Sequence, residues 1–111
     1  MASYVELTID QNTTFTSTFD LANDDGTAMD VTNYTFKSEI RKSYYSTNPT
    51  ANLQITAIDS ANGHLLIRAE ATETQNVKPG RYLYDVKMTK DNGDIIRVIE
   101  GIVTITPSVS K

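Results

Sequence analysis

Apolar and polar residues alternate along most of this chain, and the spacing typical of an amphipathic helix is nearly absent. Alternation with period two is typical of half-buried β-strands, because successive side chains of a strand point to opposite faces. The pattern predicts strands over about residues 5–9, 15–21, 34–40, 53–57, 65–69, 82–88 and 96–105.

Turn-forming residues separate these predicted strands. Residues 23–26 (Asn-Asp-Asp-Gly) predict a turn, and residues 60–63 (ending in Asn-Gly) and 90–94 predict hairpins. Pro79-Gly80 begins the sixth strand, residues 43–50 read as an extended loop, and the polar stretch 72–76 has room for one helical turn.

The last strand changes phase along its length. Ile96 and Val98 lie at even-numbered positions, whereas Val103 and Ile105 lie at odd-numbered ones. In a regular strand the two pairs would point to opposite faces. A β-bulge allows such a change, and Glu100-Gly101 is the position that the sequence favours for it.

About seven short strands separated by turns predict an all-β fold, an immunoglobulin-like antiparallel β-sandwich, with a small barrel as the rival architecture. No repeat or linker divides the chain, so residues 1–111 are expected to form a single domain.

Composition narrows the classes of function. The 111 residues include no cysteine, which excludes disulfides and thiolate metal sites and fits folding in a reducing cytoplasm. The net charge of −4 argues against a general nucleic-acid binder, which needs a dense cationic face. No apolar stretch is long enough to span a bilayer, and no signal peptide is expected.

Candidate chemistry is sparse. His64 is the only histidine, and no recognisable nucleophile motif accompanies it, so an exposed turn residue is the favoured interpretation. Asp24, Asp25 and Asp30, and separately the aspartates of the 90–94 turn, could bind calcium, but ordinary turn chemistry explains them better. We therefore expect no catalytic residue, no metal, no cofactor and no enzymatic activity.

The most unusual local feature is a pair of tyrosines beside two cations. Arg41, Lys42, Tyr44 and Tyr45 form a candidate partner-contact patch, because tyrosine and arginine are enriched at interface cores. The same residue types could stack on a single-stranded nucleic acid or a sugar. Equally, one tyrosine could cap the core while the other rests on the surface.

Six segments that together cover nearly the whole chain carry a family resemblance: residues 5–11, 14–16, 30–34, 40–44, 79–86 and 97–107. They resemble small immunoglobulin-like virion proteins of tailed bacteriophages, most closely those of contractile-tailed phages of cyanobacteria. More distantly, they resemble the N-terminal domain of upper-baseplate proteins. These segments are strand and turn signatures, and they bring no catalytic residue with them. Asn33 stands where such families usually have glycine, and asparagine also tolerates a left-handed backbone.

The resemblance implies a structural component of the virion, assembled in the host cytoplasm, whose partners are other virion proteins in a symmetric homo- or hetero-oligomeric assembly. Tail, baseplate or neck is the favoured place. The alternatives are a capsid decoration protein and a carbohydrate- or receptor-binding module on the virion surface.

Overall fold

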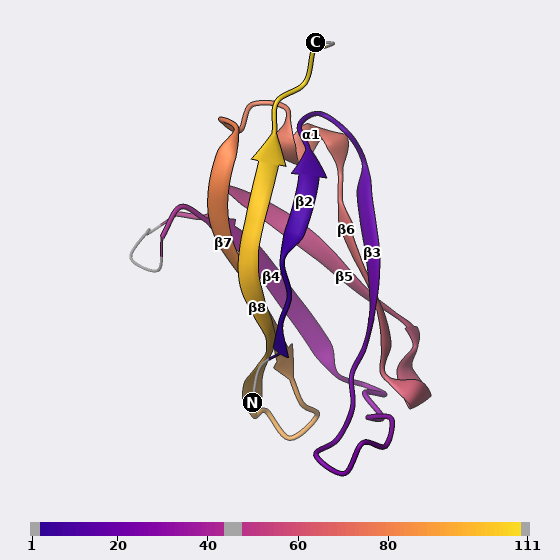
Figure 1. The fold of residues 1–111 in the computed structure, drawn as a ribbon. Helices are drawn as coiled ribbons and strands as arrows, with labels where there is room; N and C mark the ends of the chain where they lie inside the picture. The colour runs from indigo at the N-terminus through magenta and orange to yellow at the C-terminus, as the bar shows by residue number, and fades with distance from the viewer. Residues whose placement is uncertain (1–2, 44–47, 110–111) are drawn as a thin grey trace.

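The computed structural model describes residues 3–43 and 48–109, which form an immunoglobulin-like β-sandwich measuring 44 × 28 × 21 Å (Figure 1). Eight strands lie within these described residues. The elements, in chain order, are β1 (Ser3–Tyr4), β2 (Leu7–Asp10), β3 (Phe15–Asp20), β4 (Thr35–Arg41), β5 (Ala51–Asp59), the 3-10 turn η1 (Ser60–Asn62), β6 (His64–Ala69), α1 (Ala71–Thr74), β7 (Gly80–Thr89) and β8 (Ile95–Thr106).

The strands form two layers that share β5. In the first layer β8 lies beside β7 and β7 beside β4, while β1 and β2 pair successively with β8. In the second layer β6 lies between β3 and β5. Strand β5 pairs with β4 over 51–53 and with β6 from Gln54 onward, so it passes from one sheet to the other. The predicted sandwich fold is confirmed.

One detail of the fold differs from the antiparallel expectation, because β1 and β2 run parallel to β8. That expectation came from strands joined by hairpins, in which the turn imposes opposite directions. No turn joins the first strands to the last one, so their packing on the core decides the direction.

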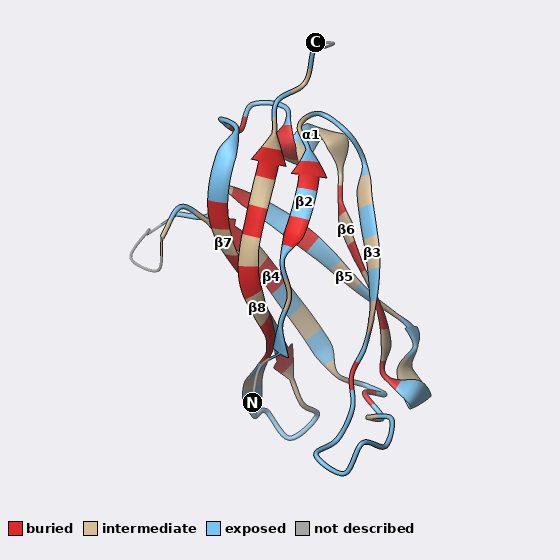
Figure 2. Ribbon diagram, viewed as in Figure 1, coloured by how far each residue is buried: buried red, intermediate tan, exposed pale blue. Residues whose placement is uncertain are grey.

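The core lies between the layers and takes mostly alternate residues from strands β2 to β8, as Figure 2 shows on β7 and β8. The largest side chains with less than 2% exposure are Ile9, Ile40, Leu65, Ile67, Met88, Ile99 and Ile105. The predicted inward residues of β7, Tyr82, Tyr84, Val86 and Met88, are all buried. Alternation therefore identified the core face of this strand correctly.

The bulge in β8 lies earlier than predicted. Lys87 pairs with Arg97 and Val86 pairs with Ile99, so Val98 is the extra residue. Val98 and Ile99 are consecutive and both buried, which reverses the phase of the strand at that point. The expectation at Glu100-Gly101 rested on the change of phase between Val98 and Val103, and Gly101 has a different role.

Gly101 allows the N-terminal segment to cross close to β8. A Cβ at this position would lie 2.0 Å from the carbonyl oxygen of Val5 and 3.2 Å from Cε1 of Tyr84. The Tyr84 hydroxyl donates a hydrogen bond of 2.6 Å to the same Val5 oxygen. The first two residues of the predicted strand 5–9 therefore lie between strands, since β1 ends at Tyr4 and β2 begins at Leu7, and the Val5 carbonyl is hydrogen bonded to the tyrosine.

The predicted turns are confirmed. Gly63 (φ 66°) and Gly93 (φ 93°) adopt left-handed conformations in the hairpins β5–β6 and β7–β8. Helix α1 provides the single helical turn between β6 and β7. The Tyr82 hydroxyl donates to the backbone carbonyl of Lys78, four residues upstream, as the corner tyrosine of many sandwiches does.

Candidate interaction surface

The outward side chains of β4, β7 and β8 form a surface that we call the charged face. The backbone register aligns them in rows that cross the three strands. The basic row contains Lys37, Lys87 and Arg97. The next row, the acidic row, contains Glu39, Asp85 and Glu100. Like charges thus lie directly opposite one another within each row.

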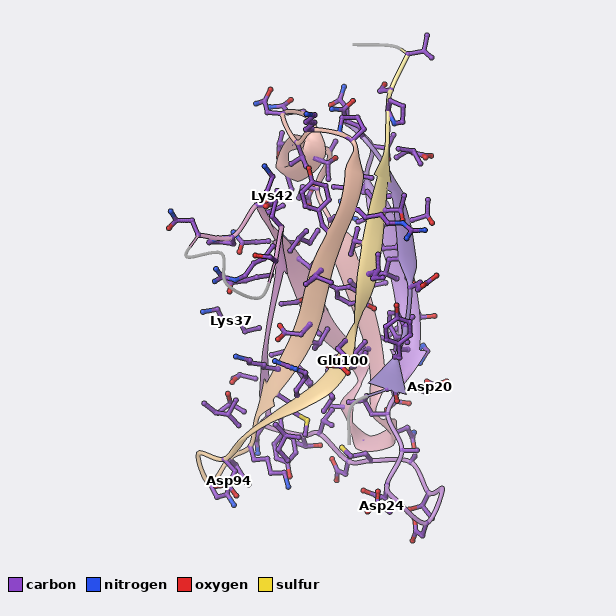
Figure 3. The ribbon with its side chains drawn as sticks, turned by 60° about the vertical axis from the view of Figure 1, so that its left-hand side comes forward. Asp20, Asp24, Lys37, Lys42, Asp94 and Glu100 are labelled. Atoms are coloured by element: carbon purple, nitrogen blue, oxygen red, sulfur yellow. The ribbon has the colours of Figure 1, made fainter. Side chains whose placement is uncertain are left out.

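A mixed row lies on the far side of the acidic row, and a neutral row lies beyond the basic one. The mixed row contains Arg41, Leu83 and Ile102, and the neutral row contains Thr35, Thr89 and Ile95. Ile95 is 66% exposed and is one of several large apolar side chains that the described part of the chain leaves exposed. Figure 3 shows Lys42 toward one end of the molecule and Asp94, in the β7–β8 turn, at the other.

Three ion pairs connect neighbouring rows. The Arg97 guanidinium lies 3.2 Å from an Asp85 oxygen and 3.1 Å from a Glu100 oxygen. Arg41 lies 2.9 Å from Glu39. Lys37 and Lys87 make no ion pair within residues 3–43 and 48–109. The central two lysines of the face are therefore left to solvent or to a partner.

The sequence singled out Arg41 and Lys42, and both lie at one edge of this face. Lys42 lines a shallow pocket of about 170 Å³ together with Arg81, Tyr82, Leu83 and Ile102. Tyr44 and Tyr45 lie outside the described residues, so the proposed tyrosine contact stays a prediction. Leu83 and Ile102 were not among the predicted site residues. Both are apolar residues at outward positions of their strands, and that pattern is the signal that could have found them.

The only histidine lies in the other sheet. His64 begins β6, where the register places it between Asp20 of β3 and Asp59 of β5. Its Nδ1 is within hydrogen-bonding distance of an Asp20 carboxylate oxygen. Among the described residues, no serine or threonine hydroxyl is hydrogen bonded to the ring. The pair links two strands without a nucleophile beside it.

The aspartates of the β3–β4 loop shape its turns. One Asp25 oxygen accepts bonds from the backbone N–H and the hydroxyl of Thr27, and Asp30 does the same with Thr32. These hydrogen bonds, the hydroxyl bond first, lower the pKa of both aspartates. Within the described ranges no group of three histidine, aspartate or glutamate side chains could hold a metal ion.

A second cleft, of about 310 Å³, opens between the sheets near the end of β3. Met29, Met88 and Ile96 supply apolar walls, while Asp20 and Arg97 lie at its rim. Asp20 lies against His64 and Arg97 against the acidic row. Asp24 of the β3–β4 loop and Lys90 of the β7–β8 turn also line the cleft.

Comparisons with known proteins support the fold. No family model and no curated protein sequence matches the chain. Among solved structures it is similar to a mutant of the SrpA adhesin from Streptococcus sanguinis, with a TM-score of 0.51 and 8% identity. The match covers 97% of this chain and 56% of the adhesin chain, so our chain spans little more than half of that protein. At this identity the likeness concerns the fold alone.

In the described part of the chain no helix is long and apolar enough to cross a membrane.

Proposed function

We propose that this chain is a non-enzymatic structural component of a bacteriophage virion, located in the tail, baseplate or neck. The observation that carries a protein-binding role is the charged face, whose exposed side chains are sorted into rows of like charge. Like charges directly opposite each other on a sheet destabilise the isolated domain. A complementary surface that covers the face would offset this repulsion.

The virion assignment itself rests on the resemblance of strand and turn segments over nearly the whole chain. A rigid sandwich of this kind suits the role, because virion symmetry repeats each contact many times. Repetition gives avidity, so each single interface need not be large or strongly apolar. The exposed charges and the small apolar area of Leu83, Ile95 and Ile102 fit an interface of that type.

An enzymatic role has less support. The described residues bring His64 and Asp20 together, but no hydroxyl nucleophile is hydrogen bonded to the imidazole. The carboxylates of the acidic row are held by arginines on an open, outward sheet surface instead of lying in a water-excluding cleft.

Quantitative mass spectrometry of purified virus particles tests the proposal. We expect this chain in the particle, at a small multiple of about three or six copies, as a symmetric tail, neck or baseplate ring requires. Hundreds of copies would instead favour capsid decoration or coating of the tail tube.

Absence of the chain from particles would overturn the virion assignment and favour a receptor-binding module. A glycan array with the wild-type chain and Tyr45→Ala would then test that alternative, since Tyr44 and Tyr45 are the stacking candidates that the sequence offers.

A further inference from the structure

We infer that the charged face is a self-association surface, on which two copies of this chain pack as a two-fold symmetric, antiparallel dimer. The order of the charged rows along the strands points to this dimer, independently of the virion role.

From the β7–β8 turn along β7, the rows of the face are neutral, basic, acidic and then mixed. Thr89 belongs to the neutral row, Lys87 to the basic row, Asp85 to the acidic row and Leu83 to the mixed row. The rows are two residues apart on each strand, so they are evenly spaced except at the Val98 bulge of β8.

Two faces can meet around a two-fold axis in two simple ways. An axis that runs along the strands places like rows against each other, so the basic row meets a second basic row, which is repulsive. An axis that runs across the strands, between the basic and acidic rows, reverses the order of the second copy. Each strand then lies against its own copy in the opposite direction, and the charge pattern selects this arrangement.

Around this second axis the two central rows are complementary. Lys37 faces Glu39 of the second copy, Lys87 faces Asp85, and Arg97 faces Glu100. The two lysines that have no ion pair among the described residues thereby gain carboxylate partners. Each contact occurs twice, because the symmetry exchanges the two copies.

The flanking rows also match. The exposed Ile95 of the neutral row meets the mixed row of the second copy, where Leu83 and Ile102 line the shallow pocket. The carboxylates of the β7–β8 turn, Asp91 and Asp94, then lie toward the Lys42 and Arg81 side of that pocket. Apolar side chains meet apolar side chains at both ends of the interface, with opposite charges around them.

Charge reversals on the central strand test the dimer. Lys87→Glu places a carboxylate against Asp85 of the second copy, and Asp85→Lys places an ammonium group against Lys87. Either single variant should raise the dissociation constant of the dimer about 100-fold or more, because each like-charge contact is strongly repulsive and occurs twice. Sedimentation equilibrium of the full chain measures this constant.

Mixing the two variants is the decisive measurement. In a mixed pair the glutamate introduced at position 87 of one copy faces the lysine introduced at position 85 of the other. The unchanged Asp85 of the first copy faces the unchanged Lys87 of the second, so both contacts become attractive. We expect two monomeric variants to form a one-to-one dimer on mixing. The double variant with both changes in one chain should also dimerise, and it serves as the test if a single variant does not fold.

Arg68→Glu is the matched control, because it makes the same change in net charge as Lys87→Glu on the outward surface of the other sheet, where Arg68 pairs with Glu70. It should leave the dimer intact, while high salt should weaken the dimer. A wild-type chain that stays monomeric up to about 1 mM would overturn the inference and leave the face to a different protein. Loss of the dimer in the control, or a mixture of folded variants that stays monomeric, would overturn it equally.

Discussion

At the scale of the residue, Tyr84 and Gly101 hold the N-terminal segment on the sandwich. The Tyr84 side chain is buried, with 4% exposure. Its hydroxyl donates a hydrogen bond to the carbonyl of Val5, which lies between β1 and β2. Gly101 leaves the space in which that carbonyl sits. The sequence marks Tyr84 as an inward tyrosine and Gly101 as a break in the alternation. It does not show that both residues contact the Val5 carbonyl.

Tyr84→Phe should lower the free energy of unfolding by about 1–3 kcal/mol, because it leaves the Val5 carbonyl without its donor. Urea unfolding measures this loss. Tyr34→Phe is the control, since no hydrogen bond of the Tyr34 hydroxyl occurs among the described residues, and it should change little. Equal losses in both variants would contradict the role of the Tyr84 bond.

The same tyrosine should make stability sensitive to alkaline pH. Burial, and to a smaller extent the charge of Tyr4, raises the pKa of Tyr84 in the folded chain. Its contribution is therefore fully present below about pH 10, where a tyrosine of the unfolded chain ionises, and declines as pH rises further. The Tyr84→Phe variant should lose stability less steeply above that pH, which urea unfolding at a series of pH values measures.

Gly101→Ala should destabilise the domain by about 2–4 kcal/mol, because the new methyl group would meet the Val5 oxygen at 2.0 Å. Gly26→Ala is the control. Gly26 has a φ of 88° with no atom near the added Cβ, so only the backbone strain of about 1–2 kcal/mol remains. Denaturant unfolding of the two variants compares them, and a smaller loss for Gly101→Ala would contradict the packing argument.

At the scale of the element, β8 is the strand that organises the first layer. It pairs with β7 along its whole length on one side and with β1 and β2 on the other. The bulge at Val98 lets its first half and its second half both bury apolar side chains. If every residue of this strand paired regularly, one half would present its apolar side chains to water.

Deleting Val98 should be tolerated. The pairs on either side, Lys87–Arg97 and Val86–Ile99, would become consecutive in a regular ladder, so only the burial of one valine is lost, about 1.5–3 kcal/mol. Deleting Ile102 instead moves Val103 and Ile105 to the outward parity and should cost more than about 4 kcal/mol. Thermal unfolding of both variants checks this, and similar losses would refute the position of the bulge.

At the scale of the whole molecule, the two sheets differ in what they expose. The first sheet exposes the charged face, with its rows of like charge. On the outward surface of the second sheet, Arg68 lies against Glu70 and His64 against Asp20. The proposed interface therefore lies on the first sheet. In a virion, this sheet would face neighbouring copies of the chain.

The sequence by itself determined the class of fold, the strands, most of the turns and the inward side of β7, because each of these depends on local spacing and local backbone preference. It also pointed to Arg41 and Lys42, through their unusual composition. Only the tertiary structure decided the parallel pairing of β2 with β8, the place of the bulge at Val98, and the rows that bring Lys87 beside Lys37 and Arg97. These features depend on the register between strands that are far apart in the chain. Packing over the whole core sets that register, so a local sequence pattern does not reveal it.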